Sequence, residues 1–509
     1  MPVLDPGRNC GELAKASRFA LLVDGSNYYG ALAQALRQAR HTIVIVGWDL
    51  DSRVRLGPGA GAEHLEPPIR DFFPALADAN PDLNIYILSW DFPFLFANVR
   101  DPKLVWGRDP FRHPRVHLKF DGTHPAGASH HQKIVAIDDC LAFAGGMDIA
   151  GGRWDSPEHR ADDIRRAGKD EPYAPSHDVQ AVVDGDAARA LARIVRDRWQ
   201  RATGAVIPAA SDQTRDLWPD CAPPDLRDVT VAISRTDVDA EGCGRREIEH
   251  LHFDLIEAAR HSIYIENQYL TSLPLAGALA RRLESPDGPE VLIVLPLNNF
   301  GWLEENTIEV LRSRCVHKLR TSDRFKRLRI CYPVVPGLDD ISLGVHSKVL
   351  AIDDRIFRIG SSNLTNRSMR LDTECDLTIE AKDAPERQGI LRLRNRLLGE
   401  HLGMPPDEVA AFLSREPSLI RLADSRSQTP RCLRELPPED HSRAPIIDDD
   451  VVDPARPITA EVVIEALASS MAARPVRRLL PWLLIGAAAT VAAVALWRAV
   501  SATSPRRSR

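Results

Sequence analysis

Short runs of aliphatic and β-branched residues alternate along the chain with stretches of helical periodicity. The runs are bounded by Gly, Pro, Asn and Asp, which is typical of buried strands. Predicted strands cover residues 42–46, 84–88, 133–137, 141–144 and 179–183, and then 229–233, 263–266, 291–295, 328–334, 348–352, 356–359 and 376–381. Helical periodicity is clear at 187–201 and 302–320. The alternation predicts an α/β protein in which largely buried mixed sheets are flanked by helices.

Two segments of the chain occur twice at nearly the same spacing. Residues 39–45 (ARHTIVI) resemble residues 259–265 (ARHSIYI), and residues 131–139 (HQKIVAIDD) resemble residues 346–354 (HSKVLAIDD). The offsets are 220 (259 − 39) and 215 (346 − 131) residues, which indicates an internal duplication. We therefore predict two similar halves, residues 1–202 and 228–403, joined by a linker at 203–227.

The ends of the chain differ from its body. After residue 403 the pattern weakens, and we predict a C-terminal extension with an acidic, flexible stalk over 404–478. Residues 479–497 carry no charge and would reach roughly 28 Å as a helix, so we predict a single transmembrane helix, with a buried Ala-rich helix as the alternative. Arginines flank both of its ends, so charge does not fix its orientation. The N-terminus lacks the apolar run of a secretory signal, and we expect a cytoplasmic catalytic body.

Composition narrows the classes of protein. The chain has 509 residues, of which 44% are hydrophobic and 27% charged, which excludes wholesale disorder, a collagen repeat and a polytopic membrane protein. Its formal net charge of −6 argues against a dedicated nucleic-acid binder. The eight cysteines are scattered without the spacing of a zinc site, so we expect reduced structural thiols.

The pattern His-x-Lys-x-x-x-x-Asp occurs once in each predicted half. The copies are His131, Lys133 and Asp138, and His346, Lys348 and Asp353. Residues two apart on a strand point to the same face, so each copy projects an imidazole and an ammonium together, which suits the binding of a phosphate. One copy would be weak evidence, since so short a pattern arises by chance, but two copies inside a duplication are specific.

These motifs resemble those of the phospholipase D superfamily, whose signature is a pair of His-Lys-Asp motifs between two similar α/β halves. The resemblance covers about residues 40–400 and includes HHQK at 130–133, GGMD at 145–148, GRWD at 152–155, HDV at 177–179 and IENQY at 265–269. These additional segments are similar to true phospholipases D and fit cardiolipin synthases and nucleases of the superfamily less well. The resemblance implies an active site at the interface of the two halves.

The expected chemistry follows from the substrate class. A phosphodiester repels anions, so its cleavage near neutral pH needs cations and a neutral, strong nucleophile such as imidazole. The resemblance favours His131 as the nucleophile that forms a phosphohistidine, and His346 as the acid that protonates the leaving alcohol and then activates water. Lys133 and Lys348 are expected to hold the nonbridging oxygens, so no metal or other cofactor is expected.

Asp148 and Asn363 hold equivalent places, each 17 residues after its motif histidine. We expect both beside the substrate phosphate, although a carboxylate there would bond to the protein rather than to phosphate oxygen.

Four further acids are expected to support the site. Each histidine needs a partner on its second ring nitrogen, and Asp178 and Glu374 are our candidates by their positions after the motifs. Asp138 and Asp353 belong to the motifs, but they end their strands at turns, where we expect them to close the loop through backbone hydrogen bonds.

We therefore expect a membrane-anchored phospholipase D-type phosphodiesterase that hydrolyses glycerophospholipids or transfers their phosphatidyl group to another alcohol. Its expected partners are phospholipid and membrane, and no nucleic acid is expected. The alternatives are a cardiolipin synthase-type phosphatidyltransferase, a nuclease of the same superfamily and an inactive lipid-binding scaffold. The sequence leaves headgroup preference, calcium dependence and oligomeric state open.

Overall fold

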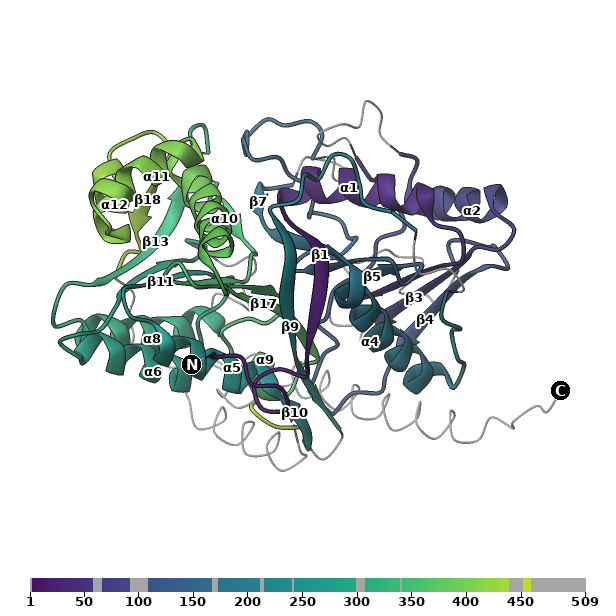
Figure 1. Ribbon diagram of the computed structural model, residues 1–509, viewed down its shortest axis with the longest axis horizontal. Helices are drawn as coiled ribbons and strands as arrows, with labels where there is room; N and C mark the ends of the chain where they lie inside the picture. The colour runs from purple at the N-terminus through teal and green to yellow at the C-terminus, as the bar shows by residue number, and fades with distance from the viewer. Residues whose placement is uncertain are drawn as a thin grey trace, which may run out of the picture.

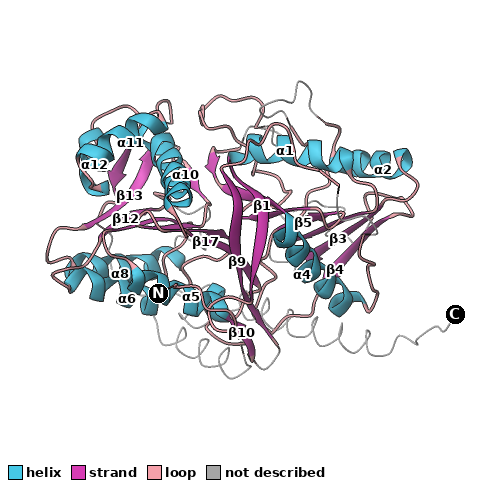
Figure 2. Ribbon diagram, viewed as in Figure 1, coloured by secondary structure: helices cyan, strands magenta, loops and turns pink. Residues whose placement is uncertain are grey.

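The protein is an α/β structure built on one 16-stranded sheet. The computed structural model describes residues 2–57, 66–91, 109–166, 173–210, 215–239, 242–298, 307–338, 341–438 and 452–458. Figures 1 and 2 show the sheet running through the whole molecule, with helices on both of its faces. The prediction of a mixed sheet flanked by helices is therefore confirmed.

The first half contains eight strands and three helices among the described residues. The strands are β1 (Glu12–Val23), β2 (Thr42–Gly47), β3 (Asn84–Trp90), β4 (Val116–Asp121), β5 (Ile134–Ile137), β6 (Leu141–Gly145), β7 (Ser176–His177) and β8 (Val179–Asp184). The helices are α1 (Asp24–Gln38), α2 (Ile69–Ala79) and α4 (Gly185–Thr203).

The second half repeats this pattern and adds elements at its end. Its strands are β9 (Leu226–Val238), β10 (Gly244–Arg246), β11 (Ser262–Glu266), β12 (Glu290–Val294), β13 (Leu328–Val334), β14 (Gly344–Val345), β15 (Val349–Ile352), β16 (Ile356–Gly360), β17 (Glu374–Glu380) and β18 (Cys432–Glu435). Its described helices are α5 (Glu247–Ala258), α6 (Leu273–Glu284), α8 (Ile308–Ser322), α9 (Asn366–Arg370), α10 (Ala384–Leu402), α11 (Pro406–Arg415) and α12 (Leu419–Arg426).

The strand order is the same in both halves when it is followed outward from the centre. The first half reads β1-β8-β6-β5-β2-β3-β4, and the second reads β9-β17-β16-β15-β11-β12-β13 before it ends at β18. The halves join where β1 pairs antiparallel with β9, for example at Ala16↔Val229. Figure 1 shows α1 and α2 above the sheet on the right, and α5, α6 and α8 below it on the left, as a twofold relation between the halves would require.

Burial explains why the predicted strands read as continuous apolar runs. All six residues of β2 are buried, and β5 and β6 are likewise buried along their whole length. Helices cover both faces of these strands, so no alternation of apolar and polar residues is needed. One core cluster spans both halves and contains Leu191 of α4 and Leu397 of α10, which fixes the halves to each other.

Strand β1, at the centre of the sheet, is absent from the predicted strands. Its sequence, ELAKASRFALLV, mixes charged and small residues with the apolar ones, and its burial is uneven at the N-terminal end. Pairing on both edges, with β8 and with β9, makes it a strand despite this weak pattern.

The structure also differs from the predicted extension over 404–478. Helices α11 and α12 pack with α10 and β18, and β18 extends the sheet by pairing with β13. Further on, the Asp453 carboxylate accepts hydrogen bonds from the Thr271 hydroxyl and from the backbone N–H groups of Asn366 and Arg367 at 2.7–2.9 Å. Residues 404–438 therefore belong to the second half, and residues 452–458 are held on the body instead of forming a flexible stalk.

Among the helices that the structure describes, none is long and apolar enough to span a membrane. The predicted transmembrane helix at 479–497 lies outside the described residues.

Candidate active site

Each motif histidine is held by the backbone of the other half. The N–H of His131 donates to the Thr373 carbonyl at 2.9 Å, and the N–H of His346 donates to the His177 carbonyl at 2.8 Å. At the second contact, β7 and β14 pair in parallel. The histidines and lysines lie just before β5 and β15, so these two strands begin one residue later than predicted. The two motifs therefore meet at the interface of the halves.

The side chain of each motif histidine also contacts a residue of the other half. The Nδ1 atom of His131 lies 3.0 Å from both carboxylate oxygens of Glu374, and the Nδ1 atom of His346 lies 2.6 Å from Asp178 Oδ2. In each case the acid directly follows the residue whose carbonyl binds the histidine N–H. An acid on Nδ1 fixes the ring tautomer and leaves Nε2 free for chemistry.

Burial and neighbouring cations set the protonation of these rings. The His131 side chain is 15% exposed and that of His346 is 8%, while their acid partners are at most 2% exposed. Burial, with the charges of Lys133 and Lys348, holds the pKa of both histidines well below its usual value. Both imidazoles are therefore neutral near neutral pH, as a nucleophile requires.

The same burial shifts the partners of the histidines toward their neutral forms. It raises the pKa of Glu374 to about 7, and it also raises the pKa of Asp178. Burial next to Lys133 and Arg153 lowers the pKa of Lys348 to about 7. The site is therefore poised to change its charge close to neutral pH.

The two lysines have different partners. The Lys133 ammonium lies 3.1 Å from Asp148 Oδ2, whereas the Lys348 ammonium donates to the neutral amide oxygen of Gln268 at 3.1 Å. Each lysine also donates to the backbone carbonyl of its own motif histidine. Both ammonium groups are thereby held next to the backbone of the motif histidines.

The equivalent residues Asp148 and Asn363 are engaged differently. One Asp148 oxygen contacts Lys133 and the other accepts the backbone N–H of Trp48 at 2.9 Å. Asn363 is buried, its backbone N–H donates to the Ser368 hydroxyl, and its Oδ1 atom has no hydrogen-bond partner among the described residues. Asp148 thus bonds to the protein, as expected of a carboxylate there.

The motif aspartates lie at the far ends of the motif strands. Asp138 accepts the backbone N–H groups of residues 40, 41 and 42 at 2.7–2.8 Å, and Asp353 accepts those of residues 260, 261 and 262 at 2.8–3.0 Å. Both adopt a positive φ at the turn, 49° and 53°. These bonds fasten each motif strand to the repeated ARH segment, in keeping with the loop-closing role expected of both aspartates.

Several residues with a place in the site were given no role by the sequence alone. Ser361 and Ser368 donate hydrogen bonds to Glu374, and Gln268 accepts one from Lys348. The positive charge of Arg153 lowers the pKa of His346 and Lys348. Arg153 and Gln268 lie in the segments GRWD and IENQY, so the resemblance contains the signal, but only the fold connects them to the motifs.

Comparisons with known proteins agree with this geometry. The family model described as "Cardiolipin synthase, PLD-like domain" matches residues 253–388. Phospholipase D A of Dictyostelium discoideum is 26% identical over 471 residues, which cover 76% of this chain and 36% of the relative. Phospholipase D1 of Saccharomyces cerevisiae is 25% identical over 492 residues, which cover 76% of this chain and 29% of the relative. The chain thus spans about a third of the length of these curated relatives.

The fold also has a counterpart among solved structures. The crystal structure of phosphatidylserine synthase from Haemophilus influenzae aligns with a TM-score of 0.53 and 16% identity, covering 83% of this chain and 98% of that one. This likeness concerns the fold, in which two similar halves share one sheet. The chain is similar to phospholipases D over about three quarters of its length, and to the PLD-like family model over part of its second half.

Proposed function

We propose that the protein is a phospholipase D-type phosphodiesterase that acts on glycerophospholipids through a phosphohistidine. The observation that carries this proposal is the reciprocal pairing of His131 with Glu374 and of His346 with Asp178 across the two halves. The pairing supports a single cleft in which two imidazoles and two ammonium groups serve one phosphate.

In the first step, Nε2 of His131 attacks phosphorus, and the bond from phosphorus to the headgroup oxygen breaks. His346 protonates that oxygen, so the headgroup leaves as an alcohol. The negative charge of the bound phosphodiester raises the proton affinity of the second imidazole, and Asp178 stabilises the imidazolium. Lys133 and Lys348 hold the nonbridging oxygens while charge develops on them.

In the second step, neutral His346 removes a proton from water, and the water oxygen attacks phosphorus. The bond to His131 breaks, which releases phosphatidate and restores the neutral imidazole. An alcohol in place of water gives a phosphatidyl-alcohol by the same proton transfers. Asn363 is proposed to donate its amide to a phosphate oxygen.

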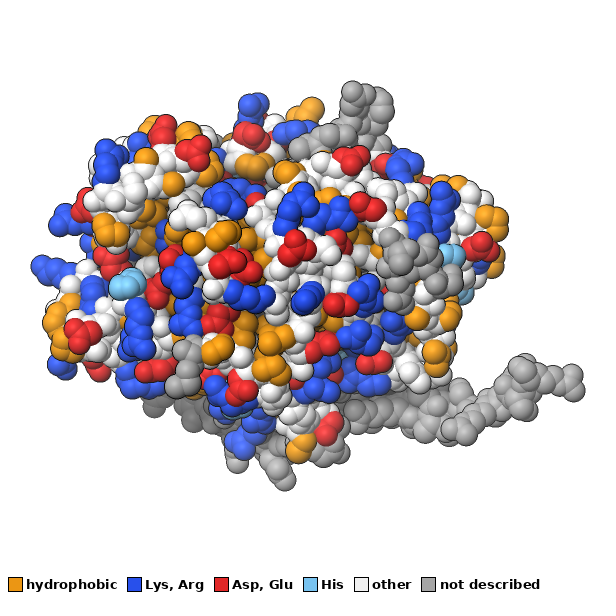
Figure 3. Space-filling view, in the orientation of Figure 1, with side chains coloured by type: hydrophobic (Ala, Val, Ile, Leu, Met, Phe, Trp, Pro, Cys, Tyr) orange, Lys and Arg blue, Asp and Glu red, His pale blue; other side chains and the backbone are white. Residues whose placement is uncertain are grey.

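The substrate class is supported by the relatives, which are named phospholipases D. We further propose that residues 479–497 anchor the chain in a bilayer with the catalytic body on the cytoplasmic side, which raises the effective substrate concentration. We do not expect a nucleic-acid substrate, because the net charge is −6 and the face in Figure 3 intersperses Lys and Arg with Asp and Glu.

A second candidate is a cardiolipin synthase-type phosphatidyltransferase. The matching family model carries that description, and the same phosphohistidine could be attacked by phosphatidylglycerol. The covalent step is common to both candidates, so the acceptor alone separates them.

The test is incubation of the purified full chain with mixed phospholipid vesicles, with and without ethanol, followed by mass spectrometry of the lipids. The proposal expects phosphatidate without ethanol and phosphatidylethanol with it. Cardiolipin formed from phosphatidylglycerol would favour the second candidate. The absence of all three products, with both histidines intact and the protein folded, would contradict both.

A further inference from the structure

A second cluster of histidines and carboxylates lies between the halves and outside the paired motifs. Asp24 begins α1, His159 lies in the loop before β7, His177 ends β7, and Glu400 lies on α10 of the second half. Three of the four side chains are 0% exposed, and that of Glu400 is 8% exposed. The mechanism above uses none of these four side chains.

The four side chains lie close enough together to hold one ion, since one nitrogen or oxygen atom of each lies within 4.8 Å of those of the others. His177 Nδ1 lies 2.8 Å from Glu400 Oε1 and 3.1 Å from Asp24 Oδ1. His159 Nε2 lies 3.1 Å from Glu400 Oε1 and 3.7 Å from Asp24 Oδ2. Four ligands bonded at 2.0–2.1 Å to a tetrahedral ion would be separated by about 3.3 Å.

Hydrogen bonding does not account for all of these contacts. His177 Nδ1 has no hydrogen-bond partner of acceptable geometry among the described residues, although two carboxylate oxygens lie within 3.1 Å of it. Asp24 Oδ2 is also buried without a hydrogen-bond partner. One cluster thus contains two buried polar atoms without hydrogen-bond partners, and a bound cation would satisfy both of them.

Both histidines also have the outer contacts of metal ligands. The second nitrogen of His159 lies 2.8 Å from Asp155, and the second nitrogen of His177 lies 3.0 Å from Glu266. In metal sites a carboxylate in this position fixes the ring tautomer and orientation, so that the lone pair of the other nitrogen is directed at the metal. In the alternative group of His177, Glu266 and His401, both carboxylate oxygens of Glu266 already accept hydrogen bonds from the two rings.

The charges of the cluster leave room for a divalent ion. Four carboxylates, Asp24, Asp155, Glu266 and Glu400, contribute −4, and the neighbouring Arg166 and Arg431 contribute +2, which leaves −2 when the histidines are neutral. Protonation of both histidines would balance the same charge and is the alternative to a bound ion. The surrounding carboxylates favour it, since they raise the pKa of His159 to about 9.

We propose that Asp24, His159, His177 and Glu400 bind one divalent cation, with Zn²⁺ as the best fit. Two imidazoles and two carboxylates in a closed, four-coordinate arrangement suit this ion, and the burial leaves no open position for a substrate. The site is therefore structural. Three ligands come from the first half and one from the second, so the ion joins the halves.

The position of the site links it to catalysis without giving it a chemical step. The His177 carbonyl accepts the N–H of His346, and the next residue, Asp178, contacts the His346 ring. An ion on His177 would hold both contacts in place. His177 and the ion thus have a positioning role toward His346.

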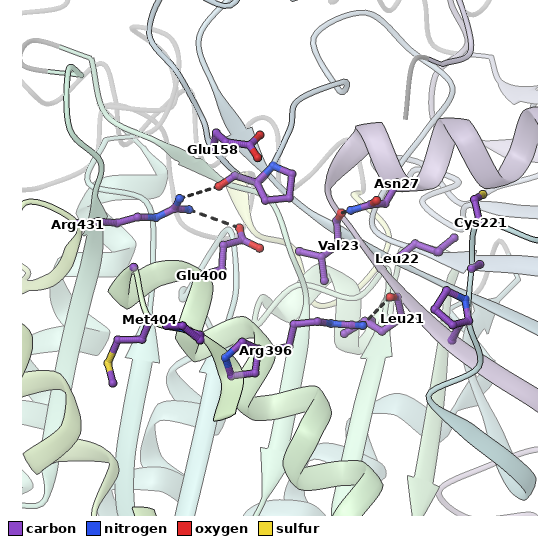
Figure 4. A pocket seen from close by; sticks show the side chains of 18 residues that line it. Leu21, Leu22, Val23, Asn27, Glu158, Cys221, Arg396, Glu400, Met404 and Arg431 are labelled. Atoms are coloured by element: carbon purple, nitrogen blue, oxygen red, sulfur yellow. Dashed lines mark hydrogen bonds and ion pairs between the residues drawn. The ribbon is translucent and has the colours of Figure 1, made fainter. Parts of the chain in front are cut away.

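An ion could reach the site through the cavity in Figure 4. This cavity of about 530 Å³ is lined by residues of α1 and α10, and Glu400 lies on its wall next to Arg431 and Glu158. The paired motif residues do not line it. Glu400 is therefore the ligand that an entering ion would meet first.

The test measures metal content in the full-length protein, expressed without a metal-binding tag in zinc-supplemented medium. We expect about one zinc per chain, and below about 0.1 per chain in His159→Gln and Glu400→Gln. His252→Gln, a change at another buried histidine, is the matched control and should keep the metal. Glu266→Gln should lower the zinc affinity by 10- to 100-fold.

A second measurement covers ligand variants that fail to fold. Wild-type protein produced with Co²⁺ should show the intense visible absorption of tetrahedral cobalt, and anomalous scattering should place the ion between His159 and His177. Wild-type protein that carries no stoichiometric metal and gives no tetrahedral cobalt spectrum would overturn the proposal in favour of two protons. Metal that persists in folded His159→Gln would overturn the assigned ligands.

Discussion

The two motif sites have the same backbone plan but different surroundings. In the first, Lys133 contacts the carboxylate of Asp148, and Glu374 meets His131 with both oxygens. In the second, Lys348 donates to a neutral amide, and Asp178 meets His346 with one oxygen at 2.6 Å.

The charge of the two sites differs as a result. In the first site the Asp148 carboxylate offsets the charge of Lys133. In the second site the positive charges of Arg153 and Lys348 both act on His346. A more neutral site suits a nucleophile, and a more cationic one suits the leaving oxygen, where negative charge develops. Under the proposed function, this difference in charge fits a division of roles between the two copies of the motif.

The largest expected effect comes from removing either imidazole. His131→Asn and His346→Asn should each lower kcat by at least about 10³-fold, because covalent attack and proton transfer are separate requirements of one cycle. Phosphatidate release from short-chain phosphatidylcholine measures this, with circular dichroism as the folding control. Near-normal activity in one of the two variants would show that the two histidines do not act in one catalytic cycle.

Neutralising the acid partners should have the next largest effect. Asp178→Asn and Glu374→Gln should lower kcat by roughly 10²- to 10³-fold, since an amide can stabilise the wrong ring tautomer. The loss should be larger in Asp178→Asn, because His346 must carry a proton during the reaction. Equal losses would argue that the two sites are functionally symmetric.

A change in pH should separate the sites further. We expect kcat/KM to be greatest near pH 7. Below that pH the Glu374 carboxylate gains a proton, because its pKa is raised to about 7. Above that pH the Lys348 ammonium loses a proton, because its pKa is lowered to about 7. Lys348→Arg should shift the alkaline limb to higher pH, because a guanidinium stays charged. Lys133→Arg is the matched control and should leave that limb in place.

The smallest effect on chemistry is expected at the motif aspartates. Asp138→Asn and Asp353→Asn should each lower the free energy of unfolding by about 2–4 kcal/mol, because a charged acceptor of three N–H groups is lost. Asp138 should show the larger change, because it is fully buried and also contacts Arg215. Urea titrations measure the loss. A fall in kcat above 10-fold in folded Asp353→Asn would contradict its structural role.

Much of the fold could be predicted because the buried strands are strongly apolar. The runs at β2, β5 and β12 are aliphatic along nearly their whole length, and burial on both faces leaves little ambiguity. Strand β1 could not be predicted this way, because its sequence lacks a continuous apolar run and its pairing with β8 and β9 makes it a strand. Residues 404–438 were missed for a similar reason, since β18 is four residues long and depends on β13.

The residues of the candidate sites also differ in how far the sequence alone could predict them. His131 and His346 could be proposed from the sequence because a repeated local motif carries them, and Asp178 and Glu374 because they follow those motifs. The cluster around His177 has no local signature: its ligands lie at positions 24, 159, 177 and 400, and only the sheet brings them together. Composition and spacing therefore reveal the motif within each half, whereas a cluster formed by residues of both halves is visible only in the fold.

The most direct test of the account is to trap the covalent intermediate and locate it. His346→Asn is mixed with a short-chain phospholipid, quenched, and analysed by intact and peptide mass spectrometry. We expect a phosphatidyl group on His131, and no adduct in the His131→Asn protein treated in the same way. An adduct on His346 in the His131→Asn protein, or a turnover-competent enzyme without any adduct, would contradict it.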